Sequence, residues 1–427
     1  MNKNMQMIFQ SQLSQYQANQ REFLIGLSGG IDSVALLHLF VQARQSLDLT
    51  LRAIHIHHGL SPNADSWVEF CQQLCQEWNV PLTVCRVKVS GKDGIEAEAR
   101  KARYQAIQQN IFLNEVLATA HHLDDQAETF FLALKRGSGI KGLSAMQAVS
   151  FAHGFTLFRP LLACSKAEIT QYAKSQKLSW IEDESNSNTD YDRNFLRQKI
   201  LPLLNQRWQQ FNQMVARASQ HCAEQQSLIE ELLEEELTRR IDAKRQKISI
   251  AGFEQFSIQK QQQLLRLWLE KSGIEMPSTA QLSQIIHQLI SADHDKNPQV
   301  VLGEYILRRY QQAIFITHSL PDILDFCLSL EPMQKIQLPA DLGEVKRTGS
   351  EIFYKISEES YHFSLPTSLH NQALTITLSA PSKVKVYGKA HREEMKKIWQ
   401  QHQVPVWLRS RIPLVFFEEQ LVLLLFL

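Results

Sequence analysis

The sequence lacks a marked excess of charge of either sign. Its 427 residues include 45 lysines and arginines against 44 aspartates and glutamates. A nearly neutral chain has no overall field that attracts nucleic acid, so any such contact must come from a local basic patch. A long hydrophobic run is also missing. The apolar stretch at 421–427 is far shorter than the roughly 20 residues that span a bilayer. We therefore expect no membrane-spanning segment.

Cysteine is scarce and shows no pairing pattern. The six cysteines contain no Cys-x-x-Cys pair and do not show the spacing of a secreted disulfide framework. The opening residues, MNKNMQMIFQSQLSQ, are too polar for a signal peptide. These features predict a cytoplasmic protein in a reducing compartment. The length allows two or three domains.

The N-terminal part alternates between two kinds of pattern. Strand-like runs occupy 22–27, 51–57, 81–89 and 115–120, and helical patterns occupy 32–45, 64–78, 95–110 and 124–135. Repeated strand–helix units favour a parallel sheet with right-handed crossovers. The sequence therefore predicts an α/β domain over residues 1–212.

The pattern changes in the second half of the chain. Leucines at helical spacing among charged residues predict a helical domain over 213–320. Short alternating runs, one basic helix and a final apolar strand predict a small α+β domain over 321–427.

A glycine-rich turn joins the first predicted strand to the first predicted helix, in LIGLSGGIDSVALLHLF at 24–40. Gly29 and Gly30 permit positive φ and close backbone approach. The free N–H groups at the start of the following helix point into the turn, where a phosphate would bind. Neither GxxxxGK[ST] nor GxGxxG is present.

The same turn also satisfies GxSxG, the nucleophile elbow of α/β-hydrolases. Only residues 1–21 precede the strand, however, and they leave no room for the earlier strand and oxyanion loop of that fold. A plain glycine turn capped by a side chain is the other alternative.

Two further polar clusters follow predicted strands. They are HIHHG at 55–59 and HHLDDQAE at 121–128. Taken alone, each could be a helix cap or a set of ordinary loop histidines. The carboxyl ends of parallel strands share one edge of a sheet, and ligands of open α/β sheets bind there. Together with the turn, the clusters predict one ligand site.

The motifs resemble those of a known family. SGGIDS resembles the PP-loop of the N-type ATP pyrophosphatases. Together with ATAHHLDDQAET, RGSGIKGLSAM and EDESNSNTDYDRNFLRQKILPLL, it resembles the tRNA(Ile)-lysidine synthetase family. The resemblance covers residues 20–205 closely and returns weakly at 388–416. It implies that the N-terminal domain has the PP-loop, adenine nucleotide alpha hydrolase-like fold.

The resemblance also implies a two-step reaction with ATP and Mg²⁺. ATP adenylates the C2 oxygen of the wobble cytidine in a tRNA(Ile) with a CAU anticodon, and pyrophosphate leaves. The amine of L-lysine then attacks C2 and expels AMP. The lysidine that forms changes decoding from AUG to AUA.

On this basis we assign a nucleotide site. The ATP-binding candidates are Ser28, Gly29, Gly30, Ile31, Asp32, Ser33, His57, His58 and His121. A carboxylate is a poor partner for phosphate, so Asp32 is interpreted as a Mg²⁺ ligand. The catalytic candidates are Asp32, Asp124, Glu128 and Arg193. Asp124 and Glu128 lie four residues apart on one helix face and could hold metal, water or the lysine ammonium.

Basic residues supply the candidates for tRNA contact, because arginine in particular suits phosphate. They are Lys135, Arg136, Lys141, Arg197, Arg392, Lys396, Lys397 and Arg409. Residues 383–411 hold eight basic and two acidic side chains, which is a reasonable footprint for RNA or a plain solvated face. Trp399 and Trp407 lie in the same stretch, as core residues or as stacking platforms.

Two other functions and a dimer stay open at this stage. A PP-loop tRNA thiolase would also adenylate a base, but Cys71 and Cys75 lie on a predicted helix facing the core and fit a sulfur-transfer role poorly. A noncatalytic module that binds ATP and RNA is the second alternative. The sequence also leaves a homodimer open.

Overall fold

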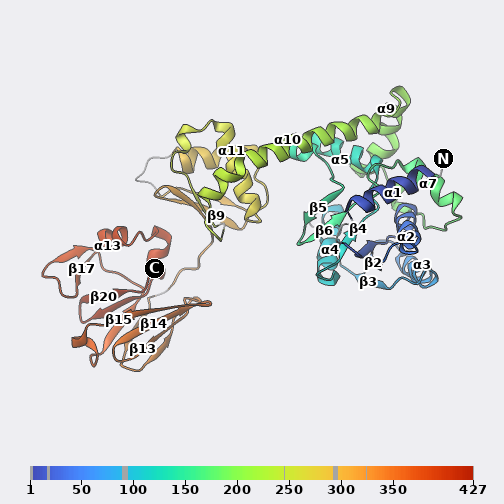
Figure 1. Cartoon of the computed structure of the whole chain (residues 1–427). Helices are drawn as coiled ribbons and strands as arrows, with labels where there is room; N and C mark the ends of the chain where they lie inside the picture. The colour runs from blue at the N-terminus through green and yellow to red at the C-terminus, as the bar shows by residue number, and fades with distance from the viewer. Residues whose placement is uncertain are drawn as a thin grey trace. The chain divides into compact units, whose positions relative to one another are not determined.

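The computed structural model describes residues 3–16, 20–88, 95–244, 246–291, 297–323 and 325–426. The chain forms two compact units, Met1–Glu230 and Glu231–Leu427 (Figure 1). Each unit has hydrophobic cores of its own. None of the helices in the described ranges combines the length and apolar character needed to cross a membrane.

A six-stranded sheet with order β3-β2-β1-β4-β6-β5 forms the centre of the first unit. Its strands are β1 Glu22–Gly26, β2 Thr50–His57, β3 Leu82–Arg86, β4 Val116–Ala118, β5 Val149–Ala152 and β6 Phe155–Phe158. All neighbouring strands pair in parallel except β5, which is antiparallel to β6 at the edge. The predicted α/β fold with its parallel sheet is confirmed.

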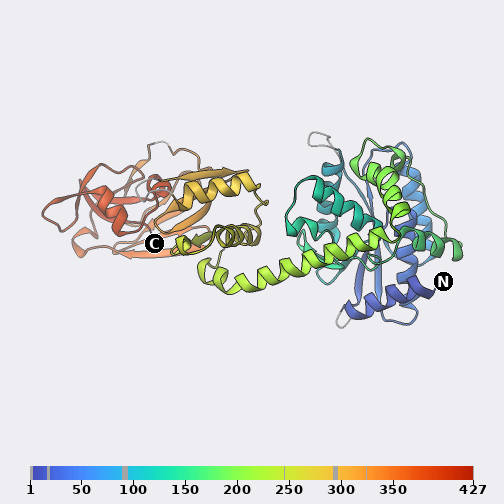
Figure 2. The same ribbon diagram turned by 90° about the horizontal axis from the view of Figure 1, so that it is seen from above.

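Helices cover both faces of this sheet (Figures 1 and 2). They are α1 Lys3–Tyr16, α2 Ile31–Arg44, α3 Ala64–Glu77, α4 Ile95–Asn110 and α7 Lys166–Ser175. Alternation along β1 divides the core: Phe23 and Ile25 pack with α1, α2, α3 and α7, whereas Leu24 packs on the other face with Tyr104 and Ile107 of α4.

The strand order reverses at β1. The chain runs from β1 to β2 and β3 on one side, and then returns to place β4 on the other side. Such a switch point leaves a crevice outside the carboxyl ends of the two central strands, where ligands of open α/β sheets bind. The turn after β1 and the His121 segment after β4 both open into this crevice.

Short helices complete the first unit beyond the sheet. They are α5 Leu123–Lys135, α6 Ile140–Leu143, the 3₁₀ helix η1 Glu184–Ser187, α8 Asp192–Phe195, the π-helical turn η2 Leu196–Ile200 and α9 Leu201–Arg207, followed by α10 Phe211–Arg240. Ala127 of α5, Leu201 of α9 and Val215 of α10 form a small separate core. This core fixes α5 beside the polar ends of the strands.

The second unit contains a sheet that the sequence analysis missed. An antiparallel sheet with order β7-β10-β9-β8 lies within 213–320, where we predicted only helices. The elements here are β7 Lys247–Ser249, η3 Phe253–Gln255, α11 Ile258–Lys271, α12 Thr279–Ile285, η4 Ile286–Ile290, β8 Gln299–Leu302, β9 Tyr305–Tyr310 and β10 Ala313–His318. The strands are short, and α11 and α12 bury one face of them in a shared core.

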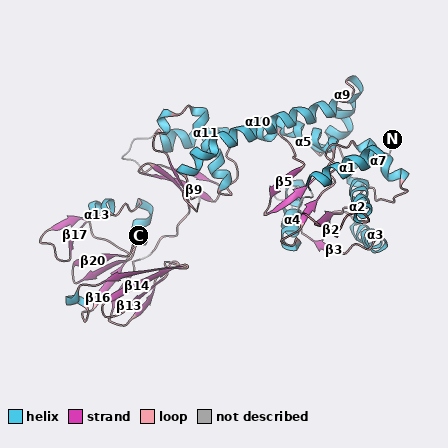
Figure 3. Ribbon diagram, in the orientation of Figure 1, coloured by secondary structure: helices cyan, strands magenta, loops and turns pink. Residues whose placement is uncertain are grey.

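The C-terminal part is rich in strands, as Figure 3 shows. One sheet has order β11-β16-β19-β20-β17-β18 and the other β12-β13-β14-β15. The elements are β11 Cys327–Leu330, β12 Lys335–Gln337, β13 Glu344–Arg347, β14 Glu351–Ile356, β15 Glu359–Ser364, η5 Thr367–Leu369, β16 Leu374–Thr377, β17 Lys383–Val386, β18 Arg392–Glu394, α13 Met395–Gln401, η6 Val406–Arg411, β19 Leu414–Phe417 and β20 Gln420–Leu424. The predicted α+β character, with one basic helix and a final apolar strand, is confirmed. The division into 1–212, 213–320 and 321–427 stays a prediction.

Candidate active site

The glycine turn links β1 to α2 in a conformation that requires glycine at one position. Gly29 has φ +89°, and a Cβ there would lie 2.6 Å from Ile181 Cδ1. The Ile181 backbone N–H also donates to the Gly29 carbonyl at 2.9 Å. The segment around Ile181 therefore packs against the turn and holds it in this conformation.

The start of α2 is open to an anion. Gly30 is the N-cap residue and no side chain caps the helix. Ser33 Oγ donates to the Gly30 carbonyl at 2.9 Å and accepts from the Ser28 N–H at 3.1 Å, which closes the turn. The N–H groups of the first helical turn have no intrahelical partner and carry the positive end of the helix dipole. A phosphate would bind here.

A cavity of about 820 Å³ lies beside the turn. All three predicted polar clusters line it, through Ser28, Asp32, Ser33, His55, His57, His58 and His121. Arg193 lines it as well, whereas Gly29, Gly30 and Ile31 shape the turn without lining the cavity. The prediction that the clusters share one sheet edge is confirmed. Ile54, Ile107 and Leu117 add an apolar wall that suits a base.

His55, His58 and His121 favour their neutral forms, because burial lowers the pKa of each. Burial, and secondly the charge of Arg103, lower the pKa of His58 to about 4. Its Nδ1 atom is buried and has no hydrogen-bond partner among the described residues. Burial also lowers the pKa of His121, whose Nδ1 lies 2.9 Å from Thr119 Oγ1. Neutral imidazoles can donate and accept hydrogen bonds but add no charge next to a nucleotide.

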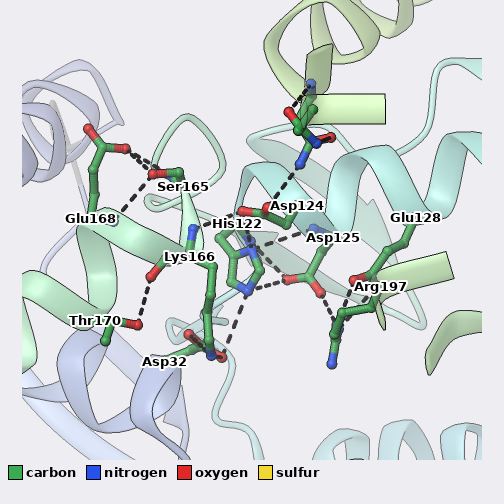
Figure 4. Close-up of polar contacts among 12 residues, drawn as sticks. Asp32, His122, Asp124, Asp125, Glu128, Ser165, Lys166, Glu168, Thr170 and Arg197 are labelled. Carbon is green, nitrogen blue, oxygen red and sulfur yellow. Dashed lines mark hydrogen bonds and ion pairs between the residues drawn. The ribbon is translucent and has the colours of Figure 1, made fainter. Parts of the chain in front are cut away.

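Asp32 belongs to a polar network, drawn in Figure 4. Lys166 Nζ is 2.7 Å from both carboxylate oxygens of Asp32, and His122 Nε2 is 3.8 Å from Oδ2. The sequence analysis did not single out Lys166 or His122 as site residues. One signal for Lys166 was available: a lysine in the first turn of a helix opposes the helix dipole, which suggests a nearby carboxylate.

Asp32 suits a magnesium ion shared with a nucleotide. The described residues contain no group of three or more His, Cys, Asp or Glu that could enclose a metal. Mg²⁺ is commonly held by one or two carboxylates together with substrate phosphates. The Asp32 side chain is 29% exposed and faces the cavity next to the anion-binding turn. The residues present therefore fit this mode of binding.

A second cavity, of about 310 Å³, lies on the other side of this network. It is lined by Asp124, Glu128, Ser165, Arg197, Asn205 and Asn212 with neighbouring residues. Asp124 Oδ2 accepts from the Lys166 backbone N–H at 2.8 Å, and Oδ1 accepts from Asn212 Nδ2 at 2.9 Å. Asp124 is thus oriented by hydrogen bonds and still faces a cavity.

Glu128 is fully buried and paired with arginine. Arg197 Nε and Nη2 donate to its two oxygens at 2.6 and 3.0 Å, and Arg193 Nε lies 3.7 Å from Oε2. Burial raises the pKa of Glu128 despite these cations. Asp125 takes part in the capping box of α5 by accepting from the His122 N–H at 3.0 Å, and also lies 3.2 Å from Arg197 Nη2. Arg197, which the sequence analysis assigned to tRNA, therefore joins the acidic residues of the second cavity.

The other basic candidates lie at the surface of their units. In the first unit Lys135 pairs with Asp192 at 2.5 Å, Lys141 lies 3.7 Å from Glu230, and Arg136 is the C-cap of α5. In the second unit Lys396 and Lys397 are exposed on α13, Arg392 pairs with Glu419 at 2.8 Å, and Arg409 Nε donates to the Val404 carbonyl at 3.3 Å. Trp399 is buried in a core and Trp407 packs against Phe315, so both tryptophans serve packing.

The fold and the site define the chain as a PP-loop enzyme that uses ATP. A family model described as "PP-loop domain" matches residues 2–204. Models described as "TilS substrate binding domain" and "TilS substrate C-terminal domain" match residues 248–315 and 374–425.

Curated relatives identify the family. The tRNA(Ile)-lysidine synthase of Actinobacillus pleuropneumoniae serotype 7 is 58% identical over 413 residues, which cover 97% of this chain and 98% of that protein. The synthase of Haemophilus ducreyi is 53% identical, with 98% and 96% covered. This chain belongs to the tRNA(Ile)-lysidine synthase family. The family membership does not favour the thiolase or the noncatalytic module.

A solved structure matches part of the chain at lower similarity. The U34-tRNA thiolase NcsA from Methanococcus maripaludis is 16% identical, covers 52% of this chain and 78% of its own, and has a TM-score of 0.46. Similarity at this level carries no functional information.

Proposed function

We propose that this enzyme joins L-lysine to C2 of the wobble cytidine in a tRNA(Ile) with a CAU anticodon, at the expense of ATP. The observation that carries the proposal is the pair of cavities on either side of the network formed by Asp32, Lys166 and Asp124. One cavity suits a nucleotide and the other a small charged molecule, as a two-step ligation requires.

ATP would occupy the larger cavity. Its phosphates would lie against the start of α2, where Ser28 and Ser33 add hydroxyl groups, and its base against the apolar wall. Asp32 would hold Mg²⁺, whose positive charge would offset the negative charge that develops on the departing pyrophosphate. Arg193 lines the same cavity and can approach the phosphate under attack. The cytidine oxygen would bond to the α-phosphorus as the bond from that phosphorus to the bridging oxygen breaks, which leaves AMP on the cytidine and releases pyrophosphate.

L-lysine would occupy the smaller cavity. Asp124 has a side chain that is 30% exposed and can attract the ammonium group, while Arg197, 38% exposed, can pair with the substrate carboxylate. Glu128 holds Arg197 in place from its buried position. The amine must lose a proton before it attacks, because an ammonium group is not nucleophilic.

The basic residues at the surface of the two units would hold the tRNA backbone. The use of tRNA and ATP as substrates supports a cytoplasmic location. Free cysteines in the described residues fit a reducing compartment as well. The catalytic unit carries three of these basic residues at its surface, Lys135, Arg136 and Lys141. They would contact the part of the tRNA nearest the wobble base.

The direct test incubates the enzyme with transcribed tRNA(Ile), ATP, Mg²⁺ and lysine. We expect pyrophosphate release and a gain in tRNA mass that requires both lysine and ATP. A sulfur donor in place of lysine should give no product. A mass gain with sulfur, or none with lysine, would overturn the proposal.

Asp32→Ala tests the nucleotide site within the same assay. Loss of the shared carboxylate should abolish AMP transfer while tRNA binding persists, measured by gel shift with labelled tRNA. Full activity of this variant would exclude Asp32 from metal binding.

A further inference from the structure

Lys166 connects the two cavities through one residue. It is the first residue of α7, after the N-cap Ser165. Its backbone N–H donates to Asp124 in the smaller cavity, and its ammonium group contacts Asp32 in the larger one (Figure 4). Because Asp32 belongs to α2, 134 positions away in sequence, only the packing of α2 against α7 brings the pair together.

The two ends of Lys166 are held differently. The backbone end is fixed by the capping box of α7, in which Ser165 and Glu168 bond each other's backbone N–H groups. The ammonium end is 44% exposed and lies on a flexible four-carbon stem. A partly exposed ion pair of this kind is weakly held, because water screens it. The stem can therefore change partners while the backbone stays on Asp124.

An ammonium group and a divalent ion compete for the Asp32 carboxylate. Lys166 Nζ lies 2.7 Å from both carboxylate oxygens of Asp32. An Mg²⁺ ion would lie closer, at about 2.0 to 2.1 Å from the oxygen that binds it. Two cations on the same two oxygens would repel each other strongly. A metal ion on Asp32 would therefore displace the Lys166 ammonium group. Phosphate oxygens bound at the open start of α2, next to Asp32, would then be its new partner.

We propose, on the basis of the function proposed above, that Lys166 exchanges Asp32 for the ATP phosphates and stabilises the pyrophosphate leaving group. With Asp32 holding Mg²⁺, the Lys166 ammonium group would contact the β- and γ-phosphate oxygens. As the cytidine oxygen bonds to the α-phosphorus, the bond from that phosphorus to the bridging oxygen breaks, and its electron pair leaves with pyrophosphate. Lys166 balances this charge without transferring a proton.

Two binding measurements on Lys166→Met test the exchange, and they should move in opposite directions. Pyrophosphate affinity, measured by calorimetry in EDTA, should fall about tenfold, the order of one lost charge-assisted hydrogen bond. Affinity for Mn²⁺ without nucleotide, measured from the free-ion signal in electron paramagnetic resonance, should rise, because the competing ammonium group is gone. A merely structural lysine would not produce opposite changes.

Lys166→Arg and Lys174→Met provide the controls. Arginine keeps the positive charge and should retain most of the pyrophosphate affinity. Lys174 lies on the same helix, exposed and away from Asp32, so its loss should leave both affinities unchanged. Circular dichroism of each variant confirms that α7 has folded.

The outcomes separate this inference from the function on which it rests. Unchanged pyrophosphate affinity in Lys166→Met would overturn the phosphate contact, and unchanged or weaker Mn²⁺ binding would overturn the competition for Asp32. Either result is compatible with lysine ligation by the wild-type enzyme. Failure of the wild type to bind pyrophosphate would instead overturn the proposed nucleotide site itself.

Discussion

Single residues set the shape and the charge of the nucleotide cavity. Gly29 shapes it through a positive φ, and the Gly29 carbonyl accepts a hydrogen bond that fixes the crossing segment. His58 contributes a neutral imidazole because burial and Arg103 disfavour its charged form. Asp32 then supplies a negative charge among these groups. The Gly29 backbone thus sets the shape of the cavity, burial keeps His58 neutral, and Asp32 adds the negative charge.

Gly29→Ala should destabilise the first unit. Alanine at φ +89° is strained, and its Cβ would meet Ile181, so the free energy of unfolding should fall by about 1 to 2 kcal/mol. Urea unfolding measures the change. Gly30→Ala is the matched control, since Gly30 has φ −72° and a Cβ added there would lie 3.5 Å from Ser28 Oγ. Equal losses in the two variants would contradict the conformational argument.

His58 should stay uncharged at neutral pH. Its folded-state pKa, about 4, lies below the unfolded value of 6.5, so the folded state binds fewer protons between these values. The stability that His58 contributes is therefore present above pH 6.5 and is lost as the pH falls toward 4. Histidine resonances followed by NMR should show no titration of His58 near pH 6.5.

The control for this titration is His58→Asn. Between pH 6.5 and 4, its free energy of unfolding should fall less steeply than that of the wild type. Some slope should remain, because burial also lowers the pKa of His38 and His55. An NMR midpoint near 6.5 would mean that the cavity is more hydrated than its burial indicates.

At the scale of elements, α5 and the π-helical turn η2 are joined by a buried charge. Glu128 of α5 has no exposed side-chain surface, and Arg197 of η2 meets both of its oxygens. A buried carboxylate without a partner is costly, so this pair fixes how the two elements pack. The same contact presents Arg197 to the smaller cavity.

Arg197→Met should therefore destabilise the fold as well as impair lysine binding. Removing one partner of a buried pair costs about 3 kcal/mol. Because the pKa of Glu128 is already raised, the loss should be smaller at pH 5 than at pH 8, where the carboxylate must stay charged with the 3.7 Å contact to Arg193 in place of the closer Arg197 pair. Calorimetric melting at the two pH values measures this difference.

Glu128→Gln in the Arg197→Met background completes the cycle. The neutral amide removes the unpaired charge and should restore much of the melting temperature. No recovery would mean that Arg197 acts through packing of its stem and not through its charge.

At the scale of the whole molecule, charge is balanced overall and concentrated locally. The net charge is +1, yet residues 383–411 carry eight basic and two acidic side chains. Lys396 and Lys397 are exposed on α13, and the described residues that line the nucleotide cavity belong to the first unit. Attraction of tRNA and binding of ATP should therefore respond to different substitutions.

Replacing Arg392, Lys396 and Lys397 by glutamine should weaken tRNA binding and reduce its salt dependence. If each contacts a phosphate, the slope of log affinity against log salt should become shallower by about 2 to 3. Filter binding over a salt series measures the slope, and ATP affinity should stay the same. Lys335, Lys346 and Lys355, on the other C-terminal sheet, form a control triple with the same charge change. An unchanged slope would mean that α13 presents a plain solvated face.

Local patterns were sufficient for much of the fold. Strands β1 to β4 and helices α2 to α5 lie within one to three residues of the predicted ranges, because apolar runs and helical patterns alternate along this part of the chain. The sheet β7-β10-β9-β8 was missed, since its strands are short and lie beside strongly helical segments. Helix α1 was missed too, although Met5, Phe9 and Leu13 recur at helical spacing and are buried.

By itself, the sequence predicted the family, the glycine turn and the gathering of polar clusters at one sheet edge, because motifs are local and repeated strand–helix units imply a parallel sheet. Only the tertiary structure decided that Lys166 meets Asp32, that Arg197 meets Glu128, and that two cavities flank the network. These contacts join residues 69 and 134 positions apart. Their distances depend on how α2, α5, α7 and η2 pack, which no local pattern specifies.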